Sequence, residues 1–135
     1  MLINQIAVFI ENSQGRLHDV VKVISTGGVN IQSLNIADTD EFGIARMVTS
    51  DNKTALKLLA DAGFTANDTD LIGVEVSDTP GTLCNVLGVL DENDISIEYI
   101  YSFTCSEGKT LILLKTDQME KAQKALFKRI KDEAK

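Results

Sequence analysis

The residues with the clearest potential for chemistry form a short turn that occurs twice in the chain. Asn12 lies three residues before Gly15, and Asp78 lies three residues before Gly81. Each turn separates an apolar strand pattern from an apolar helix pattern, so the glycine leads the backbone directly into a helix. The first N–H groups of such a helix have no acceptor within it, and together with the helix dipole they attract a small anion.

The chemistry that fits this turn is recognition of a carboxylate beside an ammonium group. The carboxylate would bind the N–H groups, and the side chain of Asn12 or Asp78 could accept a hydrogen bond from the ammonium group. Such a pair of groups describes an α-amino acid. The alternative is that Asn12 and Asp78 only cap the helices while the glycines satisfy the turn, and the turn by itself favours this capping interpretation.

Motifs for catalysis, for a cofactor and for a metal are missing from the sequence. There is one histidine, His18, and no GxSxG, GxxxxGK[ST], GxGxxG, HExxH or paired-cysteine pattern. His18 is expected to be a partly exposed helix residue, with a ligand contact as the alternative. The acidic stretch 38–41 lacks the spacing of a calcium loop, so we expect a plain loop there. The sequence thus predicts no enzyme, no metal site and no cofactor.

The overall charge argues against nucleic acid as a partner. The chain has 135 residues, of which 13 are lysine or arginine and 20 are aspartate or glutamate, giving a net charge of −7. Such a chain repels phosphate backbones. Hydrophobic residues make up 44% of the sequence, which is ordinary for a globular protein and disfavours disorder.

Neither membrane insertion nor secretion is expected. The longest apolar runs, such as Ile6–Ile10 and Leu111–Leu114, are far shorter than the roughly 20 residues of a membrane-spanning helix. The N-terminus has no signal-peptide pattern. Cys84 and Cys105 are expected to be reduced thiols of a cytoplasmic protein, with Cys84 packed in the interior rather than reactive.

The chain is an internal repeat. A shift of 66 residues places Ile6 on Ile72, Gly15 on Gly81 and Leu17 on Leu83 without a gap. The matches cluster at the same turn and in the same apolar phase, which makes chance similarity a poor explanation. We therefore expect two domains, residues 1–68 and residues 69–135.

Each repeat shows strand, helix, strand, strand and helix patterns in that order. The expected strands are 6–10, 30–37 and 44–49 in the first repeat and 72–76, 95–103 and 110–115 in the second, with helices starting near residues 17, 51, 83 and 117. This order predicts an α+β fold of two ferredoxin-like βαββαβ units, each an antiparallel sheet with its helices on one face. A short fourth strand is expected at 64–67. Its counterpart is not found, because 128–135 has the pattern of a helix or tail.

The two turns and the strands after their helices resemble the ACT domain, a small-molecule-sensing module. Asp78–Leu83 is followed by a helix and by Asn93-Asp94-Ile95-Ser96-Ile97, and Asn12–Leu17 is followed by a helix and by Gly28-Val29-Asn30-Ile31. The resemblance covers nearly the whole chain, twice, without an attached enzyme domain. The chain departs from the family pattern at Gln14, where proline is usual, at Ser96, where asparagine is usual, and in the last strand.

The resemblance implies that amino acids or similar small molecules bind at interfaces between paired domains. The ligand carboxylate would meet the N–H groups of the turn, and the second strand of a neighbouring domain would add further contacts. The resemblance assigns ligand binding to Asn12, Ser13, Gln14, Gly15, Arg16, Leu17, Asp78, Thr79, Pro80, Gly81, Thr82 and Leu83 in the turns, and to Asn30, Ile31, Ser96 and Ile97 in the second strands.

Aromatic side chains follow in the second repeat. If Ile97 and Ile100 face the helices, then Tyr99, Tyr101 and Phe103 lie on the open face of the sheet. Another sheet of the chain or of a dimer mate would cover them, or else a ligand side chain rests on them.

The sequence thus predicts a non-catalytic sensor that binds a free amino acid and regulates a partner enzyme or protein of amino-acid metabolism. We expect a cytoplasmic homodimer with no nucleic acid or membrane partner. The alternative is a structural subunit that assembles an amino-acid-metabolic enzyme without a ligand of its own. An enzyme on a ferredoxin-like scaffold is a third possibility, since fold does not fix function.

Overall fold

The structure, a computed structural model, describes residues 1–11, 13–38 and 42–133. It divides into two compact units, one formed by Asn4–Asp70 and the other by Met1–Ile3 together with the chain from Leu71 onward. The division expected from the repeat lay between residues 68 and 69 and gave residues 1–3 to the first repeat. The predicted α+β fold of two tandem ferredoxin-like units is confirmed, with six strands and four helices in the described residues. The strands expected separately at 64–67 and 72–76 form one strand, Thr65–Ser77.

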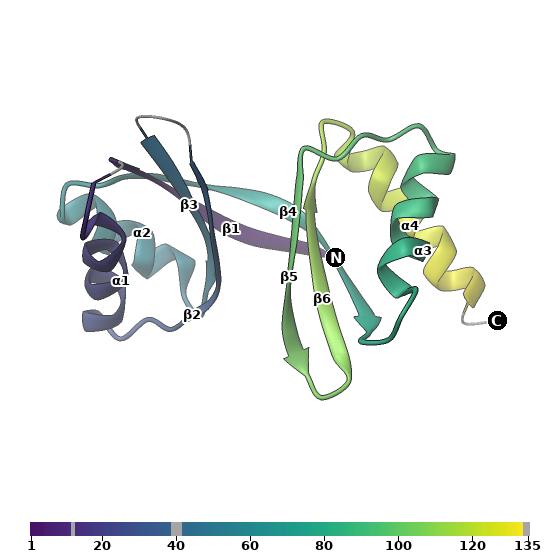
Figure 1. The fold of residues 1–135 in the computed structure, drawn as a ribbon, viewed down its shortest axis with the longest axis horizontal. Helices are drawn as coiled ribbons and strands as arrows, with labels where there is room; N and C mark the ends of the chain where they lie inside the picture. Colours follow the sequence, from purple (N-terminus) through teal and green to yellow (C-terminus); the bar gives the residue numbers. More distant parts are fainter. Residues whose placement is uncertain (12, 39–41, 134–135) are drawn as a thin grey trace. The chain divides into compact units, whose positions relative to one another are not determined.

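The unit Asn4–Asp70 contains the first repeat. Its elements are β1 (Leu2–Glu11), α1 (Arg16–Thr26), β2 (Ile31–Asp38), β3 (Phe42–Thr49), α2 (Asn52–Asp61) and the first part of β4 (Thr65–Ser77). The strand order is β2-β3-β1-β4, and β3 runs antiparallel to both β1 and β2 (Figure 1). This is the strand order expected for a ferredoxin-like unit.

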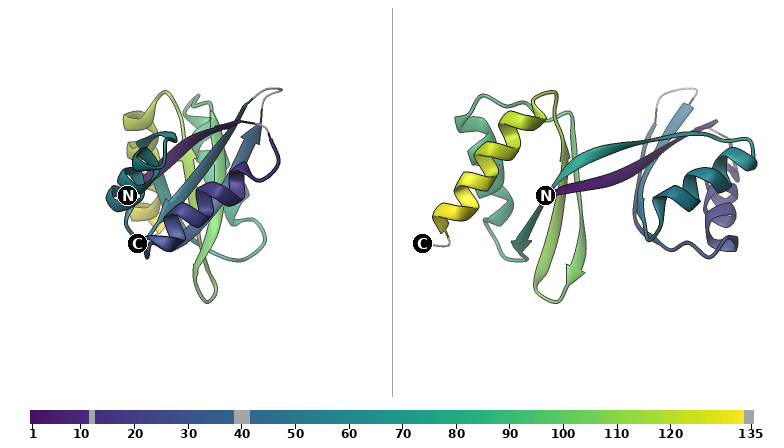
Figure 2. Two further views of the ribbon diagram at one scale, coloured as in Figure 1. Left: turned by 90° about the vertical axis from the view of Figure 1, so that its left-hand side faces the viewer. Right: turned by 180° about the vertical axis from the view of Figure 1, so that it is seen from behind.

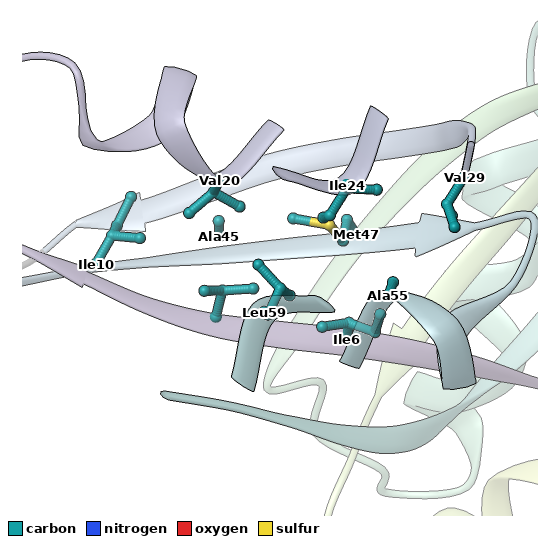
Figure 3. Packing of buried hydrophobic residues seen from close by; sticks show 10 residues of the cluster. Ile6, Ile10, Val20, Ile24, Val29, Ala45, Met47, Ala55 and Leu59 are labelled. Carbon is teal, nitrogen blue, oxygen red and sulfur yellow. The ribbon is translucent and has the colours of Figure 1, made fainter. Parts of the chain in front are cut away.

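The core of this unit lies between the sheet and its two helices. Every second residue of β1, namely Ile6, Val8 and Ile10, points toward α1 and α2 and is buried. Val20 and Ile24 of α1 and Leu59 of α2 pack against these strand residues (Figure 3). Burial of each such side chain contributes about 1.5–3 kcal/mol. The inward-facing residues of the strand, which recur every two positions, and those of the helices, which recur every three or four, therefore form one apolar layer.

The second unit repeats this arrangement with the second part of β4. Its further elements are α3 (Thr82–Glu92), β5 (Tyr99–Ser106), β6 (Lys109–Lys115) and α4 (Met119–Glu133). The strand order is β5-β6-β4, antiparallel throughout. Both helices lie on the same side of this sheet (Figure 2). The core residues are Ile72, Val74, Val86, Leu90, Ile95, Ile112, Leu114, Ala122 and Leu126.

The position of the fourth strand in the second unit is taken by the start of the chain. The Gly73 N–H donates to the Met1 carbonyl at 2.8 Å, and the Met1 ammonium group donates to the Gly73 carbonyl at 3.2 Å. Met1–Ile3 thus runs beside β4, where the first unit has its own fourth strand. The segment 128–135, where the sequence shows no strand, is helical through Glu133. A helix is one of the two structures, helix or tail, that its pattern predicts.

Two local predictions are wrong. The strand expected at 95–103 begins only at Tyr99, and Ser96 and Ile97 precede it. Cys84, expected to be packed, is exposed as a free thiol, because it lies on the side of α3 opposite the buried Val86. Of the loop expected at 38–41, Asp38 is the last residue of β2 and residues 39–41 lie outside the described residues.

Within the described ranges, the helices fall short of the length and apolarity that a membrane crossing requires. The same ranges contain no cluster of three or more histidine, cysteine, aspartate or glutamate side chains arranged to hold a metal ion.

Candidate ligand site at the second turn

The two repeated turns have nearly the same backbone. Gly15 has φ 87° and ψ −10°, and Gly81 has φ 94° and ψ −15°. These are left-handed conformations, which glycine adopts freely and other residues adopt at a cost of about 1–2 kcal/mol. Each glycine is the N-cap of the following helix. The glycine spacing seen in the sequence therefore reflects a conformational requirement at both turns.

Backbone hydrogen bonds fix the turn before α3. The Thr79 N–H donates to the Ser77 carbonyl at 2.9 Å, and the Asn85 N–H donates to the Gly81 carbonyl at 3.0 Å as the first bond of the helical ladder. The N–H groups of Leu83 and Cys84 come before that bond, so they have no acceptor inside the helix. The turn before α1 makes the same bonds, from Ser13 to Glu11 at 2.8 Å and from Asp19 to Gly15 at 3.0 Å.

The capping interpretation is wrong for Asp78. Gly81 is the N-cap of α3, and no side chain of the described residues makes a capping hydrogen bond there. The Asp78 side chain is exposed, and the Asp78 N–H donates to the Gly108 carbonyl at 2.9 Å. The carboxylate is therefore not used by the helix that follows it. Asn12, its counterpart in the first repeat, lies outside the described residues.

A cavity of about 450 Å³ opens at the second turn. This volume lies within the range of small-molecule sites, which is about 300–1,000 Å³. The cavity is bounded by the turn, by one side of α3 and by the neighbouring strands. Its lining residues are Val76, Ser77, Asp78, Thr79, Gly81, Thr82, Leu83, Leu87, Ile100, Tyr101, Ser102, Thr110 and Ile112.

Five residues predicted from the second turn line this cavity, namely Asp78, Thr79, Gly81, Thr82 and Leu83. The cavity lining does not include Pro80, nor Ser96 and Ile97. Ile97 packs instead against the core of the second unit. The second-strand side of the cavity comes from Ile100–Ser102, three to five residues further along the chain than the motif suggests.

Sequence reasoning also missed Leu87, Thr110 and Ile112. Leu87 stands four residues after Leu83 in the helix pattern, so both point to one face. Leu83, Leu87 and Ile100 are 48%, 37% and 38% exposed. These three large, exposed apolar side chains line one cavity, and they indicate a binding site more clearly than the strand motif does. Only the register of β5 against β6 shows that Ile112 lies opposite Ser102, with Thr110 two residues before it on β6.

The first repeat places different chemistry at the equivalent turn. Arg16 occupies the position of Thr82, and its guanidinium lies 3.4 Å from the Asp19 carboxylate and 4.6 Å from the centre of the Phe64 ring. The Arg16 Nε is buried and has no hydrogen-bond partner among the described residues. Ser13 and Gln14 are exposed, whereas Leu17 packs against the core. The two turns share a backbone but not a set of side chains.

Asn30 and Ile31 have structural surroundings. The Asn30 N–H donates to Ser50 Oγ at 3.0 Å, and the Ser50 N–H donates to the Asn30 carbonyl at 2.8 Å. Ile31 pairs with Thr49 and packs against the core of its unit. These contacts join the start of β2 to the end of β3, and a ligand role for either residue stays a prediction.

Comparisons with known proteins agree with this architecture. A family model described as an ACT domain pair matches residues 1–132. The crystal structure of a protein from Bacteroides thetaiotaomicron shares 35% sequence identity, with a TM-score of 0.88 over 96% of this chain and 89% of that one. No curated protein was found to match.

Regulatory subunits of aspartate kinase have the same fold. The ligand-free subunit from Thermus thermophilus shares 17% identity, with a TM-score of 0.65 over 93% of this chain and 91% of that one. The subunit from Thermus flavus shares 20% identity, with a TM-score of 0.60 over 95% and 94%. The family match over nearly the full length and the paired units lead to one conclusion: this chain belongs to the ACT domain pair family.

Proposed function

We propose that this protein is a non-catalytic sensor whose second turn binds a free α-amino acid. The observation that carries the proposal is the 450 Å³ cavity, which is lined by Asp78 and by residues of the turn at the start of α3. The N–H groups of Leu83 and Cys84 would receive the ligand carboxylate. The Asp78 carboxylate would accept hydrogen bonds from the ligand ammonium group.

We further propose that the protein works as a homodimer. Leu83, Leu87 and Ile100 leave a large apolar area exposed beside β5, which ends the strand order of its unit. A second copy placed against this edge would bury the three side chains and close the cavity on its open side. Ligand binding would then favour one arrangement of the two copies. The exposed free thiol of Cys84 suits a reducing cytoplasm.

The signal would pass to a partner enzyme or protein of amino-acid metabolism. Support comes from the shared fold with proteins described as regulatory subunits of aspartate kinase. A ligand can regulate such a partner only if it binds the free and the associated states with different affinities. The catalytic partner would carry out the reaction, and this chain would report the amino-acid level.

A thermal-shift scan of the full chain against the twenty amino acids tests the proposal. A ligand present at 100 times its Kd stabilises a protein by about 2.7 kcal/mol, which raises Tm by several degrees. One amino acid or one chemical group of them should raise Tm, and Asp78→Asn should remove most of the shift. If none of the twenty changes Tm or gives heat in calorimetry, the sensor function is wrong and the assembly-subunit alternative takes its place.

A further inference from the structure

The cavity at the second turn is lined by polar residues of the turn and by apolar residues of α3 and β5, with further polar residues, Tyr101, Ser102 and Thr110, on the strands. Ser77, Asp78 and Thr79 line it at the turn, where the carboxylate and ammonium groups of an amino acid would lie. Leu83 and Leu87 line it from α3, and Ile100 lines it from β5. An amino acid held by its backbone groups at the turn therefore directs its side chain toward these three apolar residues.

The charges around the cavity restrict which side chains fit. Of the described residues that line it, Asp78 alone carries a charge at neutral pH. The lining contains no lysine or arginine that could pair with a carboxylate in the ligand side chain. Likewise, no second acidic group remains to pair with a side-chain ammonium or guanidinium. A charged ligand side chain would lose its hydration without a partner, which is costly.

The apolar residues also favour one kind of neutral side chain. Leu83, Leu87 and Ile100 are each more than a third exposed, and behind them Ile112 is 3% exposed and Val76 is half-buried. Covering such surface is favourable by about 25 cal/mol per Å², and an apolar ligand side chain placed against Leu83, Leu87 and Ile100 buries no unpaired polar group. The Thr82 hydroxyl already donates to the Thr79 carbonyl at 3.0 Å, so it is not a free donor.

The first repeat provides an internal contrast. The position 66 residues before Thr82, after the matching glycine turn, is Arg16. The Arg16 guanidinium lies beside Asp19 and over the Phe64 ring. The second turn thus has an uncharged residue where the first has an arginine. The apolar character of the cavity belongs to the second repeat and is not a general property of the turn.

We infer that the second turn selects an α-amino acid with an apolar, uncharged side chain, such as leucine, isoleucine, valine or phenylalanine. This inference rests on the proposed function and names its ligand class. Asp78 holds the ammonium group, and Leu83, Leu87 and Ile100 determine specificity. Aspartate, glutamate, lysine and arginine are rejected because the lining has no partner for their side-chain charge.

Isothermal titration calorimetry on the full chain tests the ranking. The apolar amino acids should bind at least roughly tenfold more tightly than aspartate, glutamate, lysine, arginine, serine or threonine, because one methylene group in an apolar pocket already changes affinity by about tenfold or more. If a charged or hydroxyl amino acid binds as tightly as leucine, the ligand class is wrong while the sensor function stands. If no amino acid binds, both are wrong.

A charge substitution tests the location and the reason. Ser102→Arg places a cation in the cavity lining, so leucine affinity should fall at least tenfold and glutamate affinity should rise. The matched control is Ile36→Arg, at the equivalent exposed position of the first repeat, which should change neither affinity. Equal effects of the two variants, or no effect of Ser102→Arg, would overturn the assignment.

A second variant covers the case in which Ser102→Arg does not fold. Leu87→Ser changes a side chain that is 37% exposed and should preserve the fold, as checked by circular dichroism. Leucine affinity should fall at least roughly tenfold while the affinities for serine and threonine stay within about twofold. Unchanged leucine affinity in this variant would also overturn the inference.

Discussion

Met1 and Gly73 exchange two backbone hydrogen bonds, at 2.8 Å and 3.2 Å, although they are 72 residues apart in the chain. Through this pair, Met1–Ile3 completes the sheet of the second unit. The first unit continues from α2 into the strand β4, whereas the second unit continues as the helix α4 through Glu133. The absence of a side chain at position 73 makes the close approach possible. A Cβ there would lie 2.7 Å from Ile3 Cγ1 and 3.3 Å from Met1 Cγ.

Gly73→Val should therefore separate the N-terminal residues from β4. The Ile3 Cγ1 atom is not at the flexible end of its side chain, so the backbone must shift to relieve the clash. We expect a decrease of about 1–3 kcal/mol in the free energy of unfolding, measured by urea denaturation followed by circular dichroism. An unchanged urea midpoint would mean that the Met1–Gly73 pairing contributes nothing to stability.

Gly88→Ala is the control for a glycine without such a neighbour. Gly88 lies inside α3, and a Cβ there meets open space. Alanine is favoured over glycine in a helix by about 0.5–1 kcal/mol, so this variant should be more stable than the original chain. The opposite signs of the two glycine substitutions separate a packing requirement from the general effect of replacing glycine.

The sequence predicts the parts of the fold that depend on local patterns. The apolar periods of Ile6–Ile10 and Leu83–Leu90 and the glycine turns locate most of the strands and helices in both repeats, because each pattern records which side of an element is buried. The pairing of Met1 with Gly73 has no such local signal. It arises because the two repeats share the long strands β1 and β4, which a search for independent units cannot detect.

The candidate site divides in the same way. The glycine turn and Asp78 are visible in the sequence because the turn requires a left-handed residue. Ile100, Ser102 and Thr110 reach the cavity through the register of β5 against β6 and through the late start of β5 at Tyr99. A motif gives residue types at fixed spacing, whereas the opposite wall of a cavity depends on strand pairing that the motif does not contain.

Asn52 is a hydrogen-bonding centre of the first unit, and its removal should be costly. Its side-chain oxygen accepts from the Thr49 hydroxyl at 2.6 Å and from the Thr49 N–H at 3.1 Å. Its amide donates to the Asn4 carbonyl and to Asn4 Oδ1, both at 2.9 Å. Asn52→Ala leaves these half-buried groups unpaired and should lower the free energy of unfolding by about 1–3 kcal/mol.

Gln118, the residue before α4, is the control for Asn52. Gln118 donates from its side chain to the exposed Asp94 carbonyl at 3.4 Å, a weaker bond that water can replace. In urea denaturation, Gln118→Ala should therefore shift the midpoint less than Asn52→Ala. A larger shift for Gln118→Ala would contradict the assignment of Asn52 as the centre.

Asp51 should give the first unit a dependence on acid. Its carboxylate accepts from the Thr54 hydroxyl and the Thr54 N–H at the start of α2, and these bonds hold its pKa below the usual 3.8. Because the folded-state pKa is the lower one, the stabilisation is fully present above about pH 3.8 and disappears as the pH falls through the folded-state value. Asp51→Asn should thus lower the urea midpoint at pH 6, with a smaller difference at pH 3.

Asp117, an aspartate close to the start of α4, is the control for this pH experiment. The helix α4 begins at Met119, with the Ala122 N–H donating to the Gln118 carbonyl, so Asp117 is not its N-cap. In the same titration, Asp117→Asn should shift the urea midpoint less than Asp51→Asn at pH 6. If the two variants follow the same pH course, the cap at Asp51 is not the cause.

Gly81→Val and Gly15→Val separate the strain of the turn from its role in ligand binding. Both glycines are left-handed and both have open space at the Cβ position, so each substitution should cost about 1–2 kcal/mol through the backbone conformation alone. Gly81 lines the cavity and is the N-cap of α3. An amino acid that raises Tm of the original chain should therefore not raise Tm of Gly81→Val. The same amino acid should still raise Tm of Gly15→Val, although the Tm of that variant without ligand is lower. A retained shift in Gly81→Val would move the ligand away from this turn, because the same strain in the first repeat controls for the loss of stability.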